Sequence, residues 1–406
     1  MEMNVNRKRL FWGSCIALIV TSMTFAIRAG ILTKLGVEFN LSDTELGYIT
    51  SMAFLGFPIA MIIGGPLYNS LGPKKLGFIA FFSHIIGLGL TMASQGFWGL
   101  FISTFFVGFA NGMVEAAFNP LIADMFPDKK TTMLNRFHVW FPGGIVIGSL
   151  ISQVMADMSW QAQISTMLVP TFIYGFMFYG QKFPDHISDI STSSATNLKA
   201  MLSPLYLFMI ACMFLTATTE LGTTQWVERL LGNAGAEPLI ILALVTGLMA
   251  VGRFFAGPIV HRLNPTGLLL SSSVISLIGL YLLSIAQGGM TYVAAIVFAI
   301  GVCYFWPTMI GFIAEYIPKS GAFGMSIMGG AGMFATSVFQ PIIGGWIDSS
   351  RAEALASGLT GEAAELAAGQ AALTNIMLLP GILIVAFTGL LFYVKSKNKK
   401  EITQTA

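Results

Sequence analysis

Long apolar stretches alternate with short polar segments along almost the whole chain. Each apolar stretch has about 20 residues or more, the length that a helix needs to cross the hydrocarbon core of a bilayer. We therefore expect twelve membrane-spanning helices, at about residues 10–34, 44–70, 75–96, 98–126, 132–157, 160–181, 203–230, 238–262, 265–287, 289–317, 321–347 and 371–395. A basic run before the first stretch is also typical of a signal peptide. Because eleven further stretches follow, an uncleaved first helix is the better interpretation.

The composition supports an integral membrane protein and excludes an ordinary soluble domain. Of the 406 residues, 55% are hydrophobic and only 10% are charged, whereas soluble domains carry roughly 25% charged residues. The mean hydropathy is +0.76. Cys15, Cys212 and Cys303 all fall inside expected spans. We interpret them as buried apolar side chains rather than as a disulfide framework or a metal site.

The distribution of basic residues predicts how the chain is inserted. With a cytoplasmic N-terminus, the cytoplasmic segments contain 16 of the 21 lysines and arginines, as the positive-inside rule requires. The segments on the opposite side are acidic and contain Glu38, Asp43, Glu45, Glu353, Glu362 and Glu365. We expect a multi-pass protein of the plasma (inner) membrane with both termini in the cytoplasm. The net charge of +2 then reflects topology and does not indicate nucleic-acid binding.

An internal repeat relates the two halves of the chain. The longest polar stretch between spans separates six spans from six, and GPLYNSLGP (65–73) in the first half matches GPIVHRLNP (257–265) in the second. IADMFP (122–127) likewise matches IAEYIP (313–318). A parallel duplication of this kind places the binding site of a transporter at the interface of its halves, near the membrane midplane. The expected organisation is an N-terminal six-helix bundle at 1–182, a cytoplasmic linker at 183–202 and a C-terminal six-helix bundle at 203–406.

These motifs resemble the major facilitator superfamily over essentially the entire chain. That superfamily has G-x-L-x-D-R-x-G-R-K/R in the loop after its second helix, and here Gly65, Leu67, Gly72 and Lys74 fit while Asn69 replaces the aspartate. The resemblance implies an all-α integral membrane fold of twelve transmembrane helices in two six-helix repeats. It also implies secondary transport by alternating access.

The same resemblance implies an inner gate built from charged residues. Asp124 and Glu315 each stand three residues before a proline at the inner end of the fourth and tenth spans, and Lys74 and Arg262 lie in the two matching loops. We expect Arg253, on the eighth span, to form a structural ion pair with Glu315.

A narrower resemblance is to the fucose–galactose–glucose:proton symporter family. It depends on NGMVEAAFNP (111–120) and on TTELGTTQW (218–226). The helix-4 glutamate that this family uses in proton coupling falls on Glu115, and its following Asn-Pro falls on Asn119 and Pro120. The resemblance implies a proton-coupled sugar symporter.

Three polar residues of the fourth span favour the same conclusion on physical grounds. Asn111, Glu115 and Asn119 are spaced four residues apart, so they project from one helix face. Glu115 lies about 15 Å from the inner surface by helical rise, where a charge facing lipid costs several kcal/mol. One interpretation is a proton- and substrate-binding face on a wet cavity. The other is a neutral glutamic acid that hydrogen-bonds a neighbouring helix for packing.

Two charged residues occupy matching positions in the repeats. Arg28 on the first span corresponds to Glu220 on the seventh, so both should lie at a similar depth. They are expected to pair when the outer side closes, or Arg28 contacts the substrate directly, through sugar hydroxyls or a carboxylate. Snorkelling of Arg28 toward the outer interface is a third possibility.

Further candidates lie on the first, fifth, seventh and tenth spans. Thr216, Glu220, Thr223 and Trp226 are predicted to share one face, as Thr24 does with Arg28, although such hydroxyls often bond only their own backbone. Trp306, at the repeat position of Glu115, suits a platform for a sugar ring. His138 is interpreted either as a proton shuttle or as a packing residue, and Glu228 and Arg229 as solvated.

Three classes of function compete for this pattern. A secondary transporter explains the twelve spans, the repeat and the sparse midplane polarity together. An intramembrane enzyme would need a catalytic constellation, and the sequence contains neither HExxH nor GxSxG; a receptor would usually carry a soluble output domain. A Walker motif is also missing, which argues against ATP-driven transport. We therefore expect a monomeric symporter without cofactors that moves a sugar with a proton, or with sodium as the alternative coupling ion. The alternative function is an organic-anion carrier with Arg28 as its anion clamp.

Overall fold

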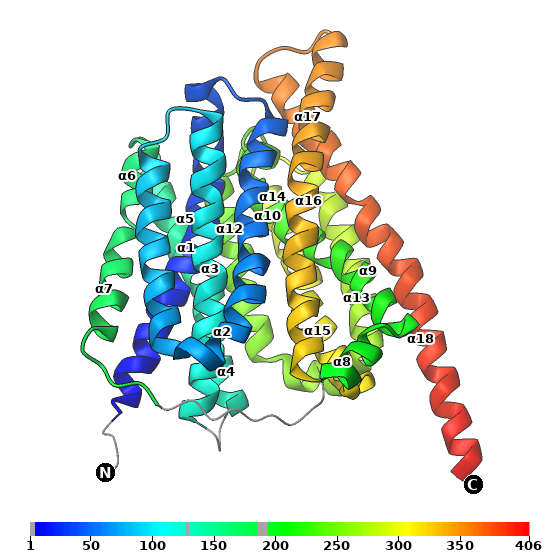
Figure 1. The fold of residues 1–406 in the computed structure, drawn as a ribbon. Helices are drawn as coiled ribbons and strands as arrows, with labels where there is room; N and C mark the ends of the chain where they lie inside the picture. The colour runs from blue at the N-terminus through cyan, green and yellow to red at the C-terminus, as the bar shows by residue number, and fades with distance from the viewer. Residues whose placement is uncertain (1–4, 127–129, 185–193, 406) are drawn as a thin grey trace.

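The computed structural model describes residues 5–126, 130–184 and 194–405, and these residues form helices and connecting turns without any strand. The helices stand side by side in one bundle (Figure 1). In the N-terminal half they are α1 (Arg7–Phe39), α2 (Asp43–Met92), α3 (Phe97–Met125), α4 (Lys130–His138), α5 (Trp140–Val154), α6 (Trp160–Ser165) and α7 (Leu168–Phe178). The C-terminal half follows α8 (Ser194–Met201) and contains α9 (Pro204–Ala217), the π-helix η2 (Thr218–Gly222), α10 (Thr223–Gln225), α11 (Val227–Leu231), α12 (Pro238–Phe254), α13 (Ala256–Ile285), α14 (Met290–Val302), α15 (Phe305–Tyr316), the 3₁₀ turn η3 (Pro318–Ser320), α16 (Gly321–Ala356), α17 (Glu362–Ile376) and α18 (Leu378–Thr405).

The twelve expected spans are confirmed. Ten helical segments of the described chain are long and apolar enough to cross a membrane. The α6–α7 pair and the shorter apolar helix α12 occupy the places of the sixth and eighth spans. Both termini lie at one end of the bundle, called here the terminal end, and the connection between α16 and α17 lies at the opposite, far end (Figure 1). α16 continues to Ala356, about two turns beyond the expected limit, and α17 already begins at Glu362.

The internal repeat is visible in the backbone as well as in the sequence. Gly72 divides α2 into two spans with φ 75° and ψ 164°, and Asn264 divides α13 with φ 52° and ψ 166°. Each stands directly before a proline, which cannot continue the preceding helix. Positive φ strains most side chains, but Asn264 has a partial compensation because its Oδ1 accepts bonds from Thr266 and Gly267.

The two halves meet most closely at the far end, where α2 packs along α16. A Cβ on Gly47 would lie 2.6 Å from the backbone oxygen of Gln340, and one on Gly344 would overlap the backbone of Asp43. Ser337 Oγ donates to the Ser51 backbone oxygen at 2.9 Å. Small residues therefore allow backbone contact between the halves, as in other membrane helix pairs.

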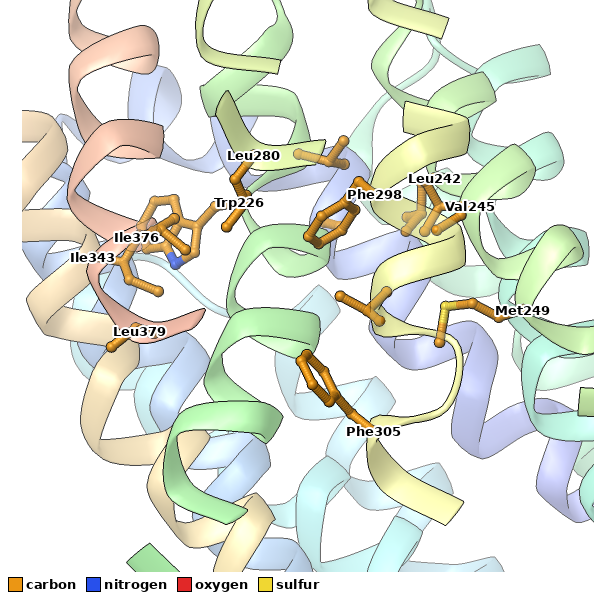
Figure 2. Packing of buried hydrophobic residues seen from close by; sticks show 14 of the residues in the cluster. Trp226, Leu242, Val245, Met249, Leu280, Phe298, Phe305, Ile343, Ile376 and Leu379 are labelled. Carbon is orange, nitrogen blue, oxygen red and sulfur yellow. The ribbon is translucent and has the colours of Figure 1, made fainter. Parts of the chain in front are cut away.

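Two apolar groupings matter for the site. Nearer the middle of the bundle, a central apolar cluster joins both halves and consists of Phe25, Phe54, Phe57 and Met333 with Met61, Phe141, Leu221 and Trp306 packed against it. A separate and larger core contains residues of both halves, and in its C-terminal part Trp226 lies among Leu280, Ile343 and Ile376 (Figure 2).

The turn at Gly72 yields a prediction about stability. Gly72→Ala is expected to destabilise the protein by roughly 1–3 kcal/mol, because a Cβ at positive φ is strained although no neighbouring atom lies within 4 Å. Gly65→Ala is the matched control, since Gly65 is helical and equally uncrowded and alanine favours helices. Thermal melting in detergent should show a lower midpoint for Gly72→Ala alone; equal midpoints would contradict the argument.

Candidate functional site

Glu115 belongs to a group of three side chains, in which Asn119 and His138 lie around its carboxyl. Asn119 Nδ2 donates to Glu115 Oε2 at 2.5 Å, and His138 Nε2 lies 3.0 Å from Asn119 Oδ1 and 3.9 Å from Glu115 Oε2. Because the amide oxygen is an acceptor, Nε2 of His138 carries the proton in this arrangement. Glu115 is buried, Asn119 is half-buried and His138 is exposed. The group thus leads from the surface on the terminal-end side of Glu115 to a buried carboxyl.

Asn111 shares the helix face of Glu115 but belongs to a different network. Its Oδ1 lies 2.9 Å from His84 Nε2, and its Nδ2 donates to Thr24 Oγ1 at 2.8 Å. Tyr174 OH lies 2.9 Å from His84 Nδ1, and Thr24 Oγ1 donates to the backbone oxygen of Thr21. Every bond is satisfied if Tyr174 donates to a neutral His84, His84 donates to Asn111, and Asn111 donates to Thr24. This buried chain fixes α1, α2, α3 and α7 to one another, so Asn111 has a packing partner as well as a predicted site role.

Arg28 lies at the meeting point of the two halves. Its Nη2 donates to Gln225 Oε1 at 2.7 Å, and its guanidinium lies over the rings of Phe25 and Phe54 at 5.1 and 5.4 Å from their centres. The residue is only 8% exposed, and its Nε is buried without a hydrogen-bond partner. Arg28 does reach across the interface as expected, but the predicted pair with Glu220 is wrong for this structure, in which the far end is closed.

Glu220 is paired within its own half instead. Arg253 Nη2 donates to Glu220 Oε1 at 3.2 Å, and Arg253 Nε donates to the Cys303 backbone oxygen at 2.8 Å. The expected Arg253–Glu315 pair is therefore also wrong. Glu315 is exposed, whereas Glu220 is only 6% exposed, and a buried carboxylate gains far more from a cation than a solvated one. The second oxygen of Glu220 remains buried and without a partner.

The π-helix η2 explains why the seventh span departs from the predicted face. A π turn contains an extra residue, which rotates all later side chains relative to an α-helix. Gln225 consequently faces α1, and Trp226, predicted to line the site, lies fully buried in the core of the C-terminal half (Figure 2). Thr223 donates to the Thr219 backbone oxygen at 2.8 Å, the alternative foreseen for such hydroxyls.

Trp306 lies at the interface of the halves, as its sequence position predicts. It is partly buried against the central apolar cluster, and a Cβ on Gly332 would approach its ring to 2.9 Å. The glycine thus leaves room for the indole between α15 and α16.

Of the predicted gate residues, Asp124, Glu315, Lys74 and Arg262 lie on segments of the terminal end, whereas Arg253 bonds Glu220 and Cys303 instead. Tyr68 OH donates to Asp124 Oδ2 at 2.9 Å, which ties α2 to α3. Lys74, Arg262 and Glu315 are exposed.

A cluster of charges at the far end was not predicted as a site. Asp43 is fully buried and accepts from Arg229 Nε at 2.6 Å and from Arg351 Nη2 at 2.5 Å. Arg351 also bonds Glu365 and Asp348. We call these five residues the far-end lock. Arg229 was interpreted as solvated, and this is wrong, because the π-shifted register of the seventh span brings it to Asp43. Glu228 is likewise half-buried, with one carboxyl oxygen wholly buried.

The lock also uses the N-terminus of α2. The carboxylate of Asp348 accepts from the backbone N–H groups of Asp43 and Thr44 at 3.1 and 2.8 Å, and from Thr44 Oγ1 at 2.6 Å. Free N–H groups and the helix dipole make such a terminus a favourable anion site. The sequence does contain a signal for this cluster, because acidic residues gather in two segments on the same side of the membrane. That pattern alone predicts topology and does not identify the partners.

Among the described residues no three His, Cys, Asp or Glu side chains are arranged to hold a metal ion. Of the polar groups above, the Arg28–Gln225 contact lies between the two halves, which is the position expected from the duplication.

Curated relatives match part of the chain. The cis,cis-muconate transport protein of Acinetobacter baylyi is 28% identical over 177 residues, which is 42% of this chain and 42% of that protein. The hexuronate transporter of Bacillus subtilis is 23% identical over 169 residues, 41% of this chain and 40% of that protein. The matches thus span about two fifths of the length of these relatives.

Solved structures match nearly the whole chain in fold. A mutant of the nucleoside transporter NupG superposes with a TM-score of 0.78 at 13% identity, covering 94% of this chain and 99% of the other. The D-xylose-proton symporter superposes with a TM-score of 0.73 at 14% identity, covering 91% and 97%. Residues 14–338 match the family described as Major Facilitator Superfamily, and the chain, a multi-pass integral membrane protein, belongs to that superfamily of transporters.

Proposed function

We propose that this protein is a secondary transporter that moves a small organic anion together with protons by alternating access. The observation that carries the proposal is the state of Arg28. Its guanidinium is buried at the interface of the halves, has one neutral hydrogen-bond partner, and forms no ion pair with the described carboxylates. A buried cation without a counter-ion is costly in a membrane protein. An anionic substrate would supply the missing charge.

Two relatives support an anionic substrate. Cis,cis-muconate and hexuronate, named for the proteins of Acinetobacter baylyi and Bacillus subtilis, both carry carboxylate groups. A carboxylate matches the planar donor geometry of a guanidinium better than a lone hydroxyl does. The organic anion thus replaces the neutral sugar as the preferred substrate class.

A neutral sugar is the second candidate. It is favoured by the Glu115 and Asn119-Pro120 pattern, which resembles the fucose–galactose–glucose:proton symporters, and by Trp306 at the interface. The two candidates differ at Arg28, which a neutral sugar would leave without a counter-ion.

Coupling to protons is assigned to the Glu115 group. His138 is exposed and lies within 3.9 Å of the buried Glu115 carboxyl. Protonation of His138 from the solvent followed by transfer to Glu115 would load the carboxyl, and deprotonation by the same route would empty it. Asn119 holds both partners and so positions this exchange.

The asymmetry between the two ends supports alternating access. The far-end lock binds residues of both halves to one another, while the Glu115 group leads toward the terminal end. If the terminal end is cytoplasmic, as the positive-inside rule predicts, the structure is closed to the outside. Opening outward then requires breaking the Asp43 and Asp348 contacts, with the terminal-end residues Asp124 and Glu315 forming the inner gate.

Substrate class is tested by uptake into proteoliposomes. Under an inward proton gradient, we expect accumulation of at least one of cis,cis-muconate, glucuronate and nicotinate, and none of glucose or xylose. Collapsing the proton gradient with an ionophore should abolish accumulation, and Arg28→Gln should abolish it with the gradient intact. Accumulation of the neutral sugars alone would reject the anion proposal. Uptake that does not change when the proton and sodium gradients are collapsed would show a facilitator rather than a symporter.

A second prediction concerns Glu115. Glu115→Gln keeps the shape and the hydrogen bond from Asn119 but cannot release a proton, so it resembles the permanently loaded state. Exchange of substrate across the membrane should persist, while accumulation driven by a pH gradient should be lost. Glu353→Gln, at an exposed far-end position, is the control and should behave as wild type. If Glu115→Gln still concentrates substrate, Glu115 is a packing residue.

A third prediction concerns the lock. Asp43→Asn leaves Arg229 and Arg351 short of a counter-ion, which weakens the closed far end by about 1.4 kcal/mol or more, or tenfold in population. In a variant without native cysteines, a cysteine at Ser51 should then react at least about tenfold faster with an impermeant maleimide. Glu45→Gln is the control, because Glu45 bonds only within its own half, to Ser42. Unchanged labelling in Asp43→Asn would show that the lock does not hold the halves together.

A further inference from the structure

Among the residues that the structure describes, Gln225 is the one polar side chain hydrogen-bonded to Arg28 across the interface. Its Oε1 accepts from Arg28 Nη2 at 2.7 Å, and it is 3% exposed. The sequence pattern gave it no role, since the π-helix that turns it toward α1 was not foreseen. A buried amide in contact with a buried guanidinium is a place where a ligand would be recognised.

The orientation of the Gln225 amide is determined by Arg28. A guanidinium has donors only, so the amide atom that faces it must be the oxygen. The NH₂ group of Gln225 therefore points elsewhere, and it is buried without a hydrogen-bond partner. Arg28 Nε is buried and unpartnered too. Two adjacent side chains, one from each half, thus present unsatisfied donors.

We infer that Gln225 is a specificity-determining residue, and that a substrate carboxylate bridges the free Nε–H of Arg28 and the free amide N–H of Gln225. This inference rests on the proposed function and names the chemical group that the site selects. The unsatisfied atoms of this pair are both donors, and a carboxylate consists of acceptors only. A sugar hydroxyl would bring a donor of its own that finds no free acceptor on the two nitrogens.

The bridge also links binding to closure. Arg28 belongs to α1 in the N-terminal half, and Gln225 ends α10 in the C-terminal half. A carboxylate held by both residues exists only while these helices are together, so the anion binds the far-end-closed state more tightly. A ligand shifts a conformational equilibrium by its difference in affinity for the two states. The bound anion therefore favours the state in which the lock is formed.

The experiment uses two variants of the full-length protein, assayed with whichever of cis,cis-muconate, glucuronate or nicotinate the wild type transports. Gln225→Leu removes the donor, and we expect the KM for that anion to rise about tenfold with the maximal rate nearly unchanged. Gln225→Glu places a carboxylate beside Arg28, so the protein supplies its own anion. We expect this variant to lose uptake and to lose the rise in melting temperature that the anion gives the wild type, while melting at least as high without ligand.

Gln340→Leu is the matched control, because Gln340 is another fully buried amide without partners, located on α16 and not hydrogen-bonded to Arg28. It should leave the KM unchanged. If Gln225 serves packing only, both Gln225 variants will melt lower and keep the wild-type KM, which overturns the inference. Retained anion uptake by Gln225→Glu overturns it as well. If the wild type transports none of the three anions, the proposed function itself fails, and that result is distinct from a wild type that transports an anion without needing Gln225.

Discussion

The structure is organised by one constraint, which is that a charge or hydrogen-bonding group inside a bilayer must find its partner within the protein. Glu220 meets this constraint through Arg253, and Asp43 through two arginines. His84 meets it through a chain of neutral hydrogen bonds. Arg28 and Gln225 satisfy it only in part, and they are two such side chains that contact each other across the halves.

The same constraint gives each level of the bundle its own kind of contact. At the far end, paired charges and glycine contacts between α2 and α16 hold the halves together. In the middle, aromatic side chains from both halves form a cluster on which the Arg28 guanidinium rests. Toward the terminal end, His138 and Asn119 connect the Glu115 carboxyl to the surface. The far-end lock, the candidate binding site at Arg28 and the proposed proton route at Glu115 therefore follow one another from the far end to the terminal end.

Much of the fold could be predicted from the sequence because it depends on local signals. Span length, the proline after Gly72 and Asn264, and the spacing of Glu115 and Asn119 each act within a few residues, and the structure contains all of them. Partner choice is not local. The sequence predicts Glu315 as the partner of Arg253, but in the structure Arg253 bonds the buried carboxylate of Glu220. A period of 3.6 residues also does not reveal the π-helix at Thr218–Gly222, so Trp226 was predicted on the wrong face and Gln225 was given no role.

The π-helix gives the seventh span a mechanical role. A π turn differs from an α turn by a single residue, and removing that residue from the turn would rotate the following segment by about 100°. Gln225 would swing away from Arg28, and Arg229 would swing away from Asp43, in the same motion. The two contacts stand four residues apart, with Gln225 at the end of α10 and Arg229 on α11, so a rotation of both short helices together would release both contacts. One small change in helical winding would then act on the candidate binding site and on the far-end lock together.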